Sequence, residues 1–201
     1  MRTKLLLKAT EKIEYATTLQ NGTLYMNTPY YYKCQCYIDF LNNESKFNSF
    51  ADFIENSSNI ISDVFEGNVG YNNAICMHED LYLYSTTAID DQNVFIYNKN
   101  AYAKINKQLI DSFKKANYNY LTFINYNKFI NTLDKCSNKL CGKNLVIYKD
   151  LSDQDTANFL RNNKKPINLF YKKPAFKYQN EFRIVTNISG GQYKIYIDCT
   201  G

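Results

Sequence analysis

Several residue types and patterns are missing from this chain, and each absence limits what the protein can be. There is no tryptophan, and His78 is the single histidine, which leaves little for a site built on histidines. No stretch approaches the ~20 consecutive apolar residues of a membrane-spanning helix, so we expect no membrane partner. The apolar run Leu5–Leu7 behind the charged start is too short for a signal peptide. We therefore expect a cytoplasmic protein with reduced cysteines.

Apolar and aromatic residues, in contrast, are abundant. Hydrophobic residues make up 45% of the chain, which excludes a disordered protein, and 19 tyrosines and 13 phenylalanines bring the aromatic content to 16%. The length of 201 residues suits one well-cored domain, and we expect residues 1–201 to form it. Asparagine and lysine are also frequent, as in proteins encoded by AT-rich DNA. Abundant lysine and tyrosine therefore need no functional cause.

Positive charge is concentrated in one segment, while the net charge of the whole chain is +5. Between residues 161 and 183 the single acid is Glu181. The basic residues there are Arg161, Lys164, Lys165, Lys172, Lys173, Lys177 and Arg183. With Tyr171 and Tyr178 they predict a basic, tyrosine-rich face for an anionic partner, such as an acidic protein surface or nucleic acid. The alternative is a solvated, lysine-rich loop.

The spacing of apolar residues predicts a mixture of strands and helices. Strands are expected at residues 3–9, 23–27, 74–77, 81–87, 93–97, 120–124, 145–148, 181–187 and 192–198, the last two as a hairpin. Helices are expected at residues 11–20 with Thr10 as N-cap, and at 47–61, 101–116, 127–134 and 152–161. The absence of a βαβ rhythm favours an α+β fold, with one twisted, mainly antiparallel sheet and flanking helices. The segment Gln179–Val185 is expected to be central or next to central in it.

Cysteine, histidine and acidic residues form weaker candidate sites. The residues of types that bind zinc are Cys34, Cys36, Cys76 and His78. Their spacing within each pair is tighter than in typical zinc sites, so we expect ordinary thiols and no metal. Asp63 and Glu66 precede a glycine, where acids more often solvate a loop than bind a metal.

One compact group of residues is suited to bond chemistry: Gln179, Glu181 and Arg183. In an extended segment Gln179 and Glu181 share a face, where an amide and a carboxylate can orient a sugar hydroxyl and stabilise positive charge. Arg183 and Lys177 would keep the pKa of the Glu181 carboxyl low and the side chain anionic. The alternative is structural, because Glu181 and Arg183 can form an ion pair that orders the strand.

The run aromatic–Gln–x–Glu–aromatic–Arg, preceded by Lys173-Pro174, resembles the end of a broad group of phage and bacterial proteins whose activity is not established. Gly22–Asn27, Asp63–Gly67 and Leu145–Asp150 fit the same group in order, and the likeness spans most of the chain. The resemblance implies a phage-type protein that acts inside a bacterial host cell.

A more distant resemblance is to ADP-ribosyltransferase toxins, in which a Gln-x-Glu loop carries the catalytic glutamate that holds the nicotinamide ribose of NAD. Tyr84–Thr87 resembles part of their aromatic–Ser–Thr–Ser strand, and Arg2, Lys4 or Lys8 could stand for the basic residue of their first strand. This chain departs from the family in ending that strand motif with a threonine and in placing Glu181 farther along.

The same resemblance implies roles for individual residues. Glu181 becomes the catalytic carboxylate and Gln179 the group that positions the acceptor, with Ser85 and Thr86 as supporting residues. The NAD phosphates would be held by Lys172, Lys173 or Arg183.

Two functions follow from these observations. The first is a non-catalytic, anti-CRISPR-like counter-defence protein without a cofactor. It would inhibit a host nuclease or defence complex, protein or ribonucleoprotein, through its basic, tyrosine-rich face. The alternative is an ADP-ribosyltransferase-like enzyme that uses NAD with Glu181 as catalytic carboxylate. The lack of a complete catalytic set favours the first, and whether Glu181 is free or paired with Arg183 separates the two.

Overall fold

The structure, a computed structural model, describes residues 2–27, 42, 46, 81–136, 140–149, 167–172, 174–187 and 193–196. Its elements in chain order, with η for short 3-10 helices, are β1 (Thr3–Thr10), α1 (Ile13–Gln20), β2 (Thr23–Met26), β3 (Leu81–Asp90), η5 (Asp91–Asn93), β4 (Val94–Tyr97), β5 (Asn100–Ala103), α4 (Lys107–Lys115), β6 (Tyr120–Asn125), α5 (Tyr126–Cys136), β7 (Leu140–Leu145), β8 (Ile147–Tyr148), η6 (Ile167–Phe170), β9 (Tyr171–Lys172), η7 (Pro174–Gln179), β10 (Glu181–Asn187) and β11 (Tyr193–Tyr196). The elements predicted at residues 47–61, 74–77 and 152–161 lie outside the described residues. None of the described helices has the length and apolarity to cross a bilayer.

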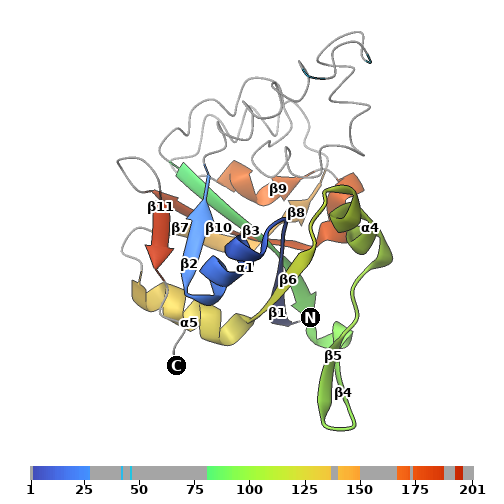
Figure 1. Cartoon of the computed structure of the whole chain (residues 1–201). Coiled ribbons are helices and arrows are strands. Elements are labelled where there is room, and N and C mark those ends of the chain that lie inside the picture. Colours follow the sequence, from blue (N-terminus) through green and yellow to red (C-terminus); the bar gives the residue numbers. More distant parts are fainter. Residues whose placement is uncertain are drawn as a thin grey trace.

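Five strands form an antiparallel sheet in the order β6-β1-β3-β10-β7 (Figure 1). The central strand β3 pairs with β1 on one side and with β10 on the other. This arrangement confirms the predicted α+β fold with a mainly antiparallel sheet and flanking helices. It also places β10 next to the centre of the sheet, as the sequence predicts.

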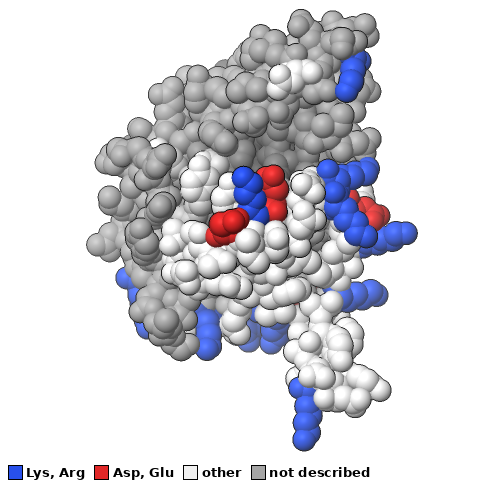
Figure 2. Space-filling view, in the orientation of Figure 1, with Lys and Arg blue, Asp and Glu red and all other residues white. Residues whose placement is uncertain are grey.

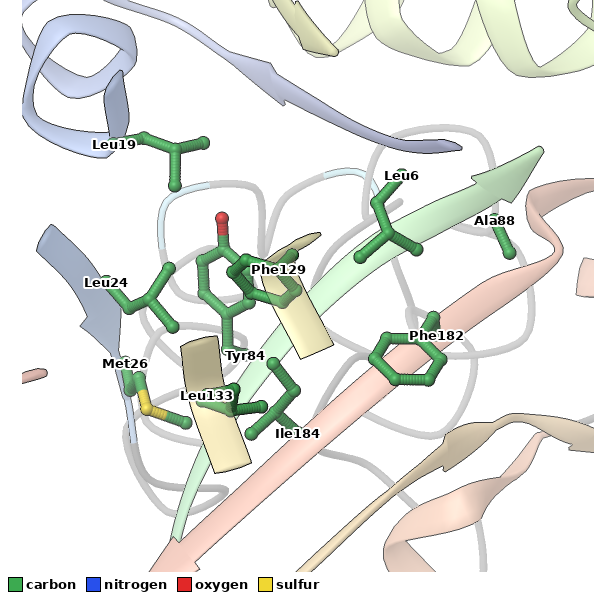
Figure 3. Packing of buried hydrophobic residues seen from close by; sticks show 10 residues of the cluster. All are labelled: Leu6, Leu19, Leu24, Met26, Tyr84, Ala88, Phe129, Leu133, Phe182 and Ile184. Atoms are coloured by element: carbon green, nitrogen blue, oxygen red, sulfur yellow. The ribbon is translucent and has the colours of Figure 1, made fainter. Parts of the chain in front are cut away.

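One face of the sheet carries the main hydrophobic core (Figure 3). The cluster consists of Leu6, Leu19, Leu24, Met26, Tyr84, Ala88, Phe129, Leu133, Phe182 and Ile184. Its members in β3 and β10 lie an even number of residues apart, because successive side chains of a strand point to opposite faces, and Leu6 of β1 joins them. The remaining members come from α1, β2 and α5, which cover this face.

The opposite face of β3 and β10 changes from apolar to polar along its length. At one end Leu81, Leu83, Leu169 and Val185 form a small second cluster. Further along, the paired residues are polar: Ser85 lies opposite Arg183, and Thr87 lies opposite Glu181. Charged side chains are rarely buried without a partner, so this polar end of the sheet is the candidate functional site.

The structure corrects the helix predicted at residues 101–116. The first residues of that range form β5, which pairs with β4 as a hairpin, and only α4 is helical. Asn98 and Lys99 form the turn with φ of 48° and 64°, the left-handed conformations of a two-residue hairpin turn. The rings of Phe95 and Tyr102 stack across the hairpin at 5.5 Å. Turn geometry and this cross-strand pair therefore override the helical spacing.

Three smaller predictions also differ from the structure. β11 pairs with β2 and not with β10, because both edges of β10 are already taken by β3 and β7. Thr10 continues β1, and the N-cap of α1 is Lys12, without a side-chain cap. The strand predicted at residues 145–148 is divided at Val146 between the end of β7 and β8.

Candidate functional site

A buried cluster of charged and polar side chains lies on the polar face of β10. The Glu181 carboxylate uses both oxygens: Oε1 accepts from Lys172 Nζ at 2.8 Å, and Oε2 accepts from Arg183 Nε at 2.9 Å. Arg183 Nη2 lies 2.7 Å from Oε2 as a further ion-pair contact without hydrogen-bond alignment. Lys172 Nζ also donates to Gln179 Oε1 at 2.5 Å and lies 5.0 Å from the centre of the Phe176 ring. Glu181 is therefore paired with Arg183 and with a second cation.

The segment from Lys172 to Glu181 folds back so that its two ends meet. Pro174 begins η7, consistent with the fixed φ of proline, which suits the first turn of a helix. Asn180 then takes a left-handed φ of 42°, and its side-chain amide donates to the Ala88 carbonyl at 2.6 Å. The backbone N–H of Ala88 donates in turn to the Asn180 carbonyl at 2.8 Å. These two reciprocal hydrogen bonds fix the turn at Asn180. Gln179 and Glu181 therefore do not share one face of an extended segment, as the sequence predicts. Instead, the Lys172 ammonium bridges their two side chains.

Arg183 is the most deeply buried cation of the cluster. It is 0% exposed, and its Nη1 donates to the Leu169 carbonyl at 2.6 Å. The backbone N–H of Glu181 donates to the Tyr148 hydroxyl at 2.8 Å. The cluster therefore ties η6, β8, β9 and η7 to the strand β10.

Electrostatics keep the Glu181 carboxylate anionic. Burial by itself raises the pKa of this carboxyl, but the nearby Arg183 and Lys172 charges and their hydrogen bonds lower it below its ordinary value of 4.5. Burial and the Glu181 charge raise the pKa of the Tyr148 hydroxyl, which stays neutral. With two cations and one anion, this set of groups carries a net charge of +1.

Beside the cluster is a small pocket between the polar face of the sheet and α4. Ser85, Thr87, Gln179 and Glu181 line it, opposite Leu109, Ser112 and Phe113 of α4. Its volume of about 50 Å³ is room for only a few water molecules. The buried Ser85 Oγ has no hydrogen-bond partner among the described residues.

Thr86 and Lys8, which the sequence assigns to the site of Glu181, line the same pocket but send their polar groups to the core face of the sheet. Thr86 alternates with Ser85, and its hydroxyl donates to the Phe182 carbonyl at 3.3 Å on the core side. Lys8 lies next to Leu7, which pairs with Thr87. Its side chain therefore leaves β1 on the core side, where Nζ lies 5.1 Å from the centre of the Tyr84 ring and donates to the Ser85 carbonyl. Strand alternation thus places Lys8 on the face opposite Glu181, while Lys4 is exposed at the register shift between Thr3 and Leu5.

A wider groove of about 290 Å³ adjoins the small pocket, and Thr87 and Leu109 line both. Its polar lining consists of Asn93, Lys104, Asn106, Lys177, Tyr178 and Asn180. Lys104 and Lys177 are exposed, and none of the described residues that line the groove is acidic. The groove also lies at the N-terminus of α4, whose N-cap is Asn106. Two ammonium groups and the helix dipole contribute positive potential to the groove, while the Asp90 carboxylate, which accepts from the Asn93 side chain at 2.8 Å, adds one negative charge beside it.

The predicted binding residues therefore divide into three groups. Lys177 is exposed, and Tyr171 and Tyr178 are partly exposed. Lys172 and Arg183 lie in the interior, where Glu181 engages both cations. Four predicted binding residues lie outside the described residues: Arg161, Lys164, Lys165 and Lys173. The residues of the weaker candidate sites also lie outside them: Cys34, Cys36, Asp63, Glu66, Cys76 and His78.

Sequence reasoning missed Lys104 and Asn106 as groove residues. They lie more than 70 residues before Lys177 and fall inside the helix that was predicted at residues 101–116. A correct hairpin prediction at Asn98–Lys99 would have placed them at the start of α4. Comparisons of the chain with protein families, curated proteins and solved structures gave no match.

Proposed function

We propose that this protein is a non-catalytic, phage-type binding protein that inhibits a host nuclease or defence complex in the bacterial cytoplasm. The observation that carries the proposal is the engagement of both Glu181 oxygens by Lys172 and Arg183. A carboxylate that must receive a substrate hydroxyl needs an accessible oxygen, and Glu181 is only 4% exposed. Its position is that of a residue that holds the sheet together.

The surface best suited to a partner is the wide groove and its surroundings. Lys177 and Tyr178 come from the basic, tyrosine-rich segment, and Lys104 adds a cation from the other wall. Figure 2 shows further basic side chains over α4, where Lys107, Lys114 and Lys115 accompany one acid, Asp111. Two kinds of partner surface complement this positive charge: an acidic protein face, and nucleic acid that is bound to the partner.

A charge-reversal experiment tests this surface. Lys104→Glu combined with Lys177→Glu is expected to weaken binding to the target complex by tenfold or more, since it replaces two attractive charges with two repulsive ones. Biolayer interferometry on a panel of purified bacterial nuclease and defence complexes measures this. Lys135→Glu on α5, across the sheet, is the matched control and should leave binding unchanged. Equal affinity of the double variant and the wild type would exclude the groove as the contact surface.

A second candidate function is an ADP-ribosyltransferase-like enzyme. It is favoured by one observation: Ser85, Gln179 and Glu181 line one pocket, and this pocket joins a groove with two lysines. In this reading Lys104 and Lys177 hold the NAD phosphates, while the anionic Glu181 stabilises positive charge on the ribose. The pocket would have to widen and Glu181 would have to release a cation.

Direct measurement with NAD tests the second candidate. An enzyme of this type should bind NAD with a dissociation constant of about 1 mM or tighter, and Ser85→Ala should lower NAD turnover without unfolding the protein. Calorimetric titration with NAD and mass spectrometry of protein targets for added ADP-ribose measure both. No heat of binding and no labelled target would remove this candidate and leave the binding protein.

A further inference from the structure

The hairpin of β4 and β5 extends from the body of the protein as an apolar arm (Figure 1). The residues on its surface include Phe95, Ile96, Tyr97 and Tyr102, which are between 43% and 79% exposed. Lys99 in the turn is the one charged residue between residues 94 and 103. Figure 2 shows the arm as uncharged surface except near its end. A two-stranded hairpin is marginally stable by itself in water, so a solvated apolar arm is an unfavourable arrangement.

Apolar side chains occupy both faces of the arm. Phe95 pairs with Tyr102, and the Tyr97 ring lies 6.4 Å from that of Tyr102, so these three rings share one face. Ile96 pairs with Ala101 and lies on the other face, where it is 79% exposed. A partner that accepts this arm must offer apolar surface.

The same chain offers such a surface on the edge strand β6. Leu121 and Phe123 lie on one face of this strand and are 41% and 49% exposed. The sequence of β6 contains no charged residue and no proline, the residues with which proteins usually protect an edge strand from pairing. In the described sheet, β6 has β1 on one side and no strand on the other.

The size of the two surfaces also suits self-association. A large side chain that is about half exposed contributes on the order of 100 Å² of accessible surface that an interface can bury. Without Ile96, which lies on the other face of the arm, the five exposed residues of the arm and the edge therefore offer roughly 500 Å² per copy, near the lower end of what a stable interface buries per partner. Twofold symmetry makes each copy supply both surfaces, so two arm-to-edge contacts form at once.

We propose that two copies of this chain form a reciprocal dimer in which the β4–β5 arm of each copy packs on β6 of the other. The inference rests on the arm and the edge strand alone and is independent of the function proposed above. Lys104 follows the arm directly, so the dimer would also fix the position of one wall of the wide groove.

Sedimentation equilibrium of the full chain tests the dimer, at concentrations from about 0.1 to 100 µM to cover dissociation constants near 1 µM. The wild type should change from monomer to dimer across this range. An arm variant, Phe95→Ser with Tyr97→Ser, and an edge variant, Phe123→Lys, should each raise the dissociation constant by at least tenfold. Tyr25→Ser, at a residue of similar exposure on β2, is the control and should dimerise like the wild type.

Mixing the two variants gives the sharper result. The edge variant retains an intact arm and the arm variant an intact edge, so the mixture should form a heterodimer through one native contact. Neither variant should dimerise alone at that concentration, and circular dichroism should confirm that both are folded. A monomeric wild type at every concentration, or a dimer that either variant leaves intact, would overturn the proposal. So would a mixture that stays monomeric.

Discussion

Replacing Glu181 by glutamine is expected to lower the free energy of unfolding by about 3–5 kcal/mol, the cost of leaving buried charges without their counter-charge. The amide keeps the size of the side chain but cannot neutralise Lys172 and Arg183, whose side chains are 2% and 0% exposed. Urea denaturation followed by circular dichroism measures the change. A loss below about 1 kcal/mol, as for an exposed ion pair, would contradict a structural role for this carboxylate.

Lys172→Met is the matched comparison for this experiment. It removes one cation and leaves Glu181 paired with Arg183, so the cluster becomes neutral. The methionine fills much of the volume of the lysine stem, and the expected loss is about 1–2 kcal/mol from the broken hydrogen bonds. Glu181→Gln should therefore lower the unfolding free energy more than Lys172→Met does. This order tests the charge balance of the cluster, because a catalytic role for Glu181 predicts no such difference in stability.

The Glu181 substitution also has a predicted dependence on pH. The pKa of this carboxyl is lower in the folded protein than its ordinary value of 4.5. Its contribution to stability is therefore fully present above pH 4.5 and is lost as the pH falls through the lowered pKa. The difference in unfolding free energy between wild type and Glu181→Gln should shrink in that acidic window. A constant difference from pH 7 to pH 2 would show that the carboxyl is not responsible for it.

The second large effect is expected in the main core. Leu133→Ala on α5 should lower the unfolding free energy by about 2–5 kcal/mol, because it removes buried methyl groups and leaves a cavity. Leu133 is 0% exposed and lies in the cluster with Tyr84 and Ile184 (Figure 3). Ile13→Ala on α1 is the control, since Ile13 is 53% exposed and should change stability by under about 0.5 kcal/mol. Equal effects of the two substitutions would show that α5 does not pack as described.

Most of the sheet could be predicted from the sequence because its strands are short runs rich in apolar and β-favouring residues. Buried neighbours such as Leu6 and Leu7 in β1, and Ile184 and Val185 in β10, lie on opposite faces, because successive side chains of a strand point to opposite sides. The pairing of β11 with β2 could not be predicted in this way. It depends on which strand edges remain free after β10 has taken two neighbours, and no local pattern contains that information.

The sequence indicates Gln179, Glu181 and Arg183 as one group, but it does not predict the geometry of the buried cluster in which the structure places them. The Glu181–Arg183 ion pair is one of the two arrangements that the sequence predicts, and the structure contains it. The role of Lys172 was not visible, because its ammonium reaches Glu181 only after η7 folds the segment back. The same fold-back at η7 explains why Lys172, although it belongs to the basic segment, is buried.

The separation of β3 and β10 in the sequence has a consequence for synthesis of the chain. Thr87 pairs with Glu181, so nearly a hundred residues must leave the ribosome after β3 before its second neighbour exists. During that interval one edge of the central strand is open, and nascent chains with open strand edges are prone to associate wrongly. Folding that depends on such distant pairs is also slow. We therefore expect the yield of soluble protein to depend on translation rate and on chaperones that hold the nascent chain more than on the stability of the finished fold.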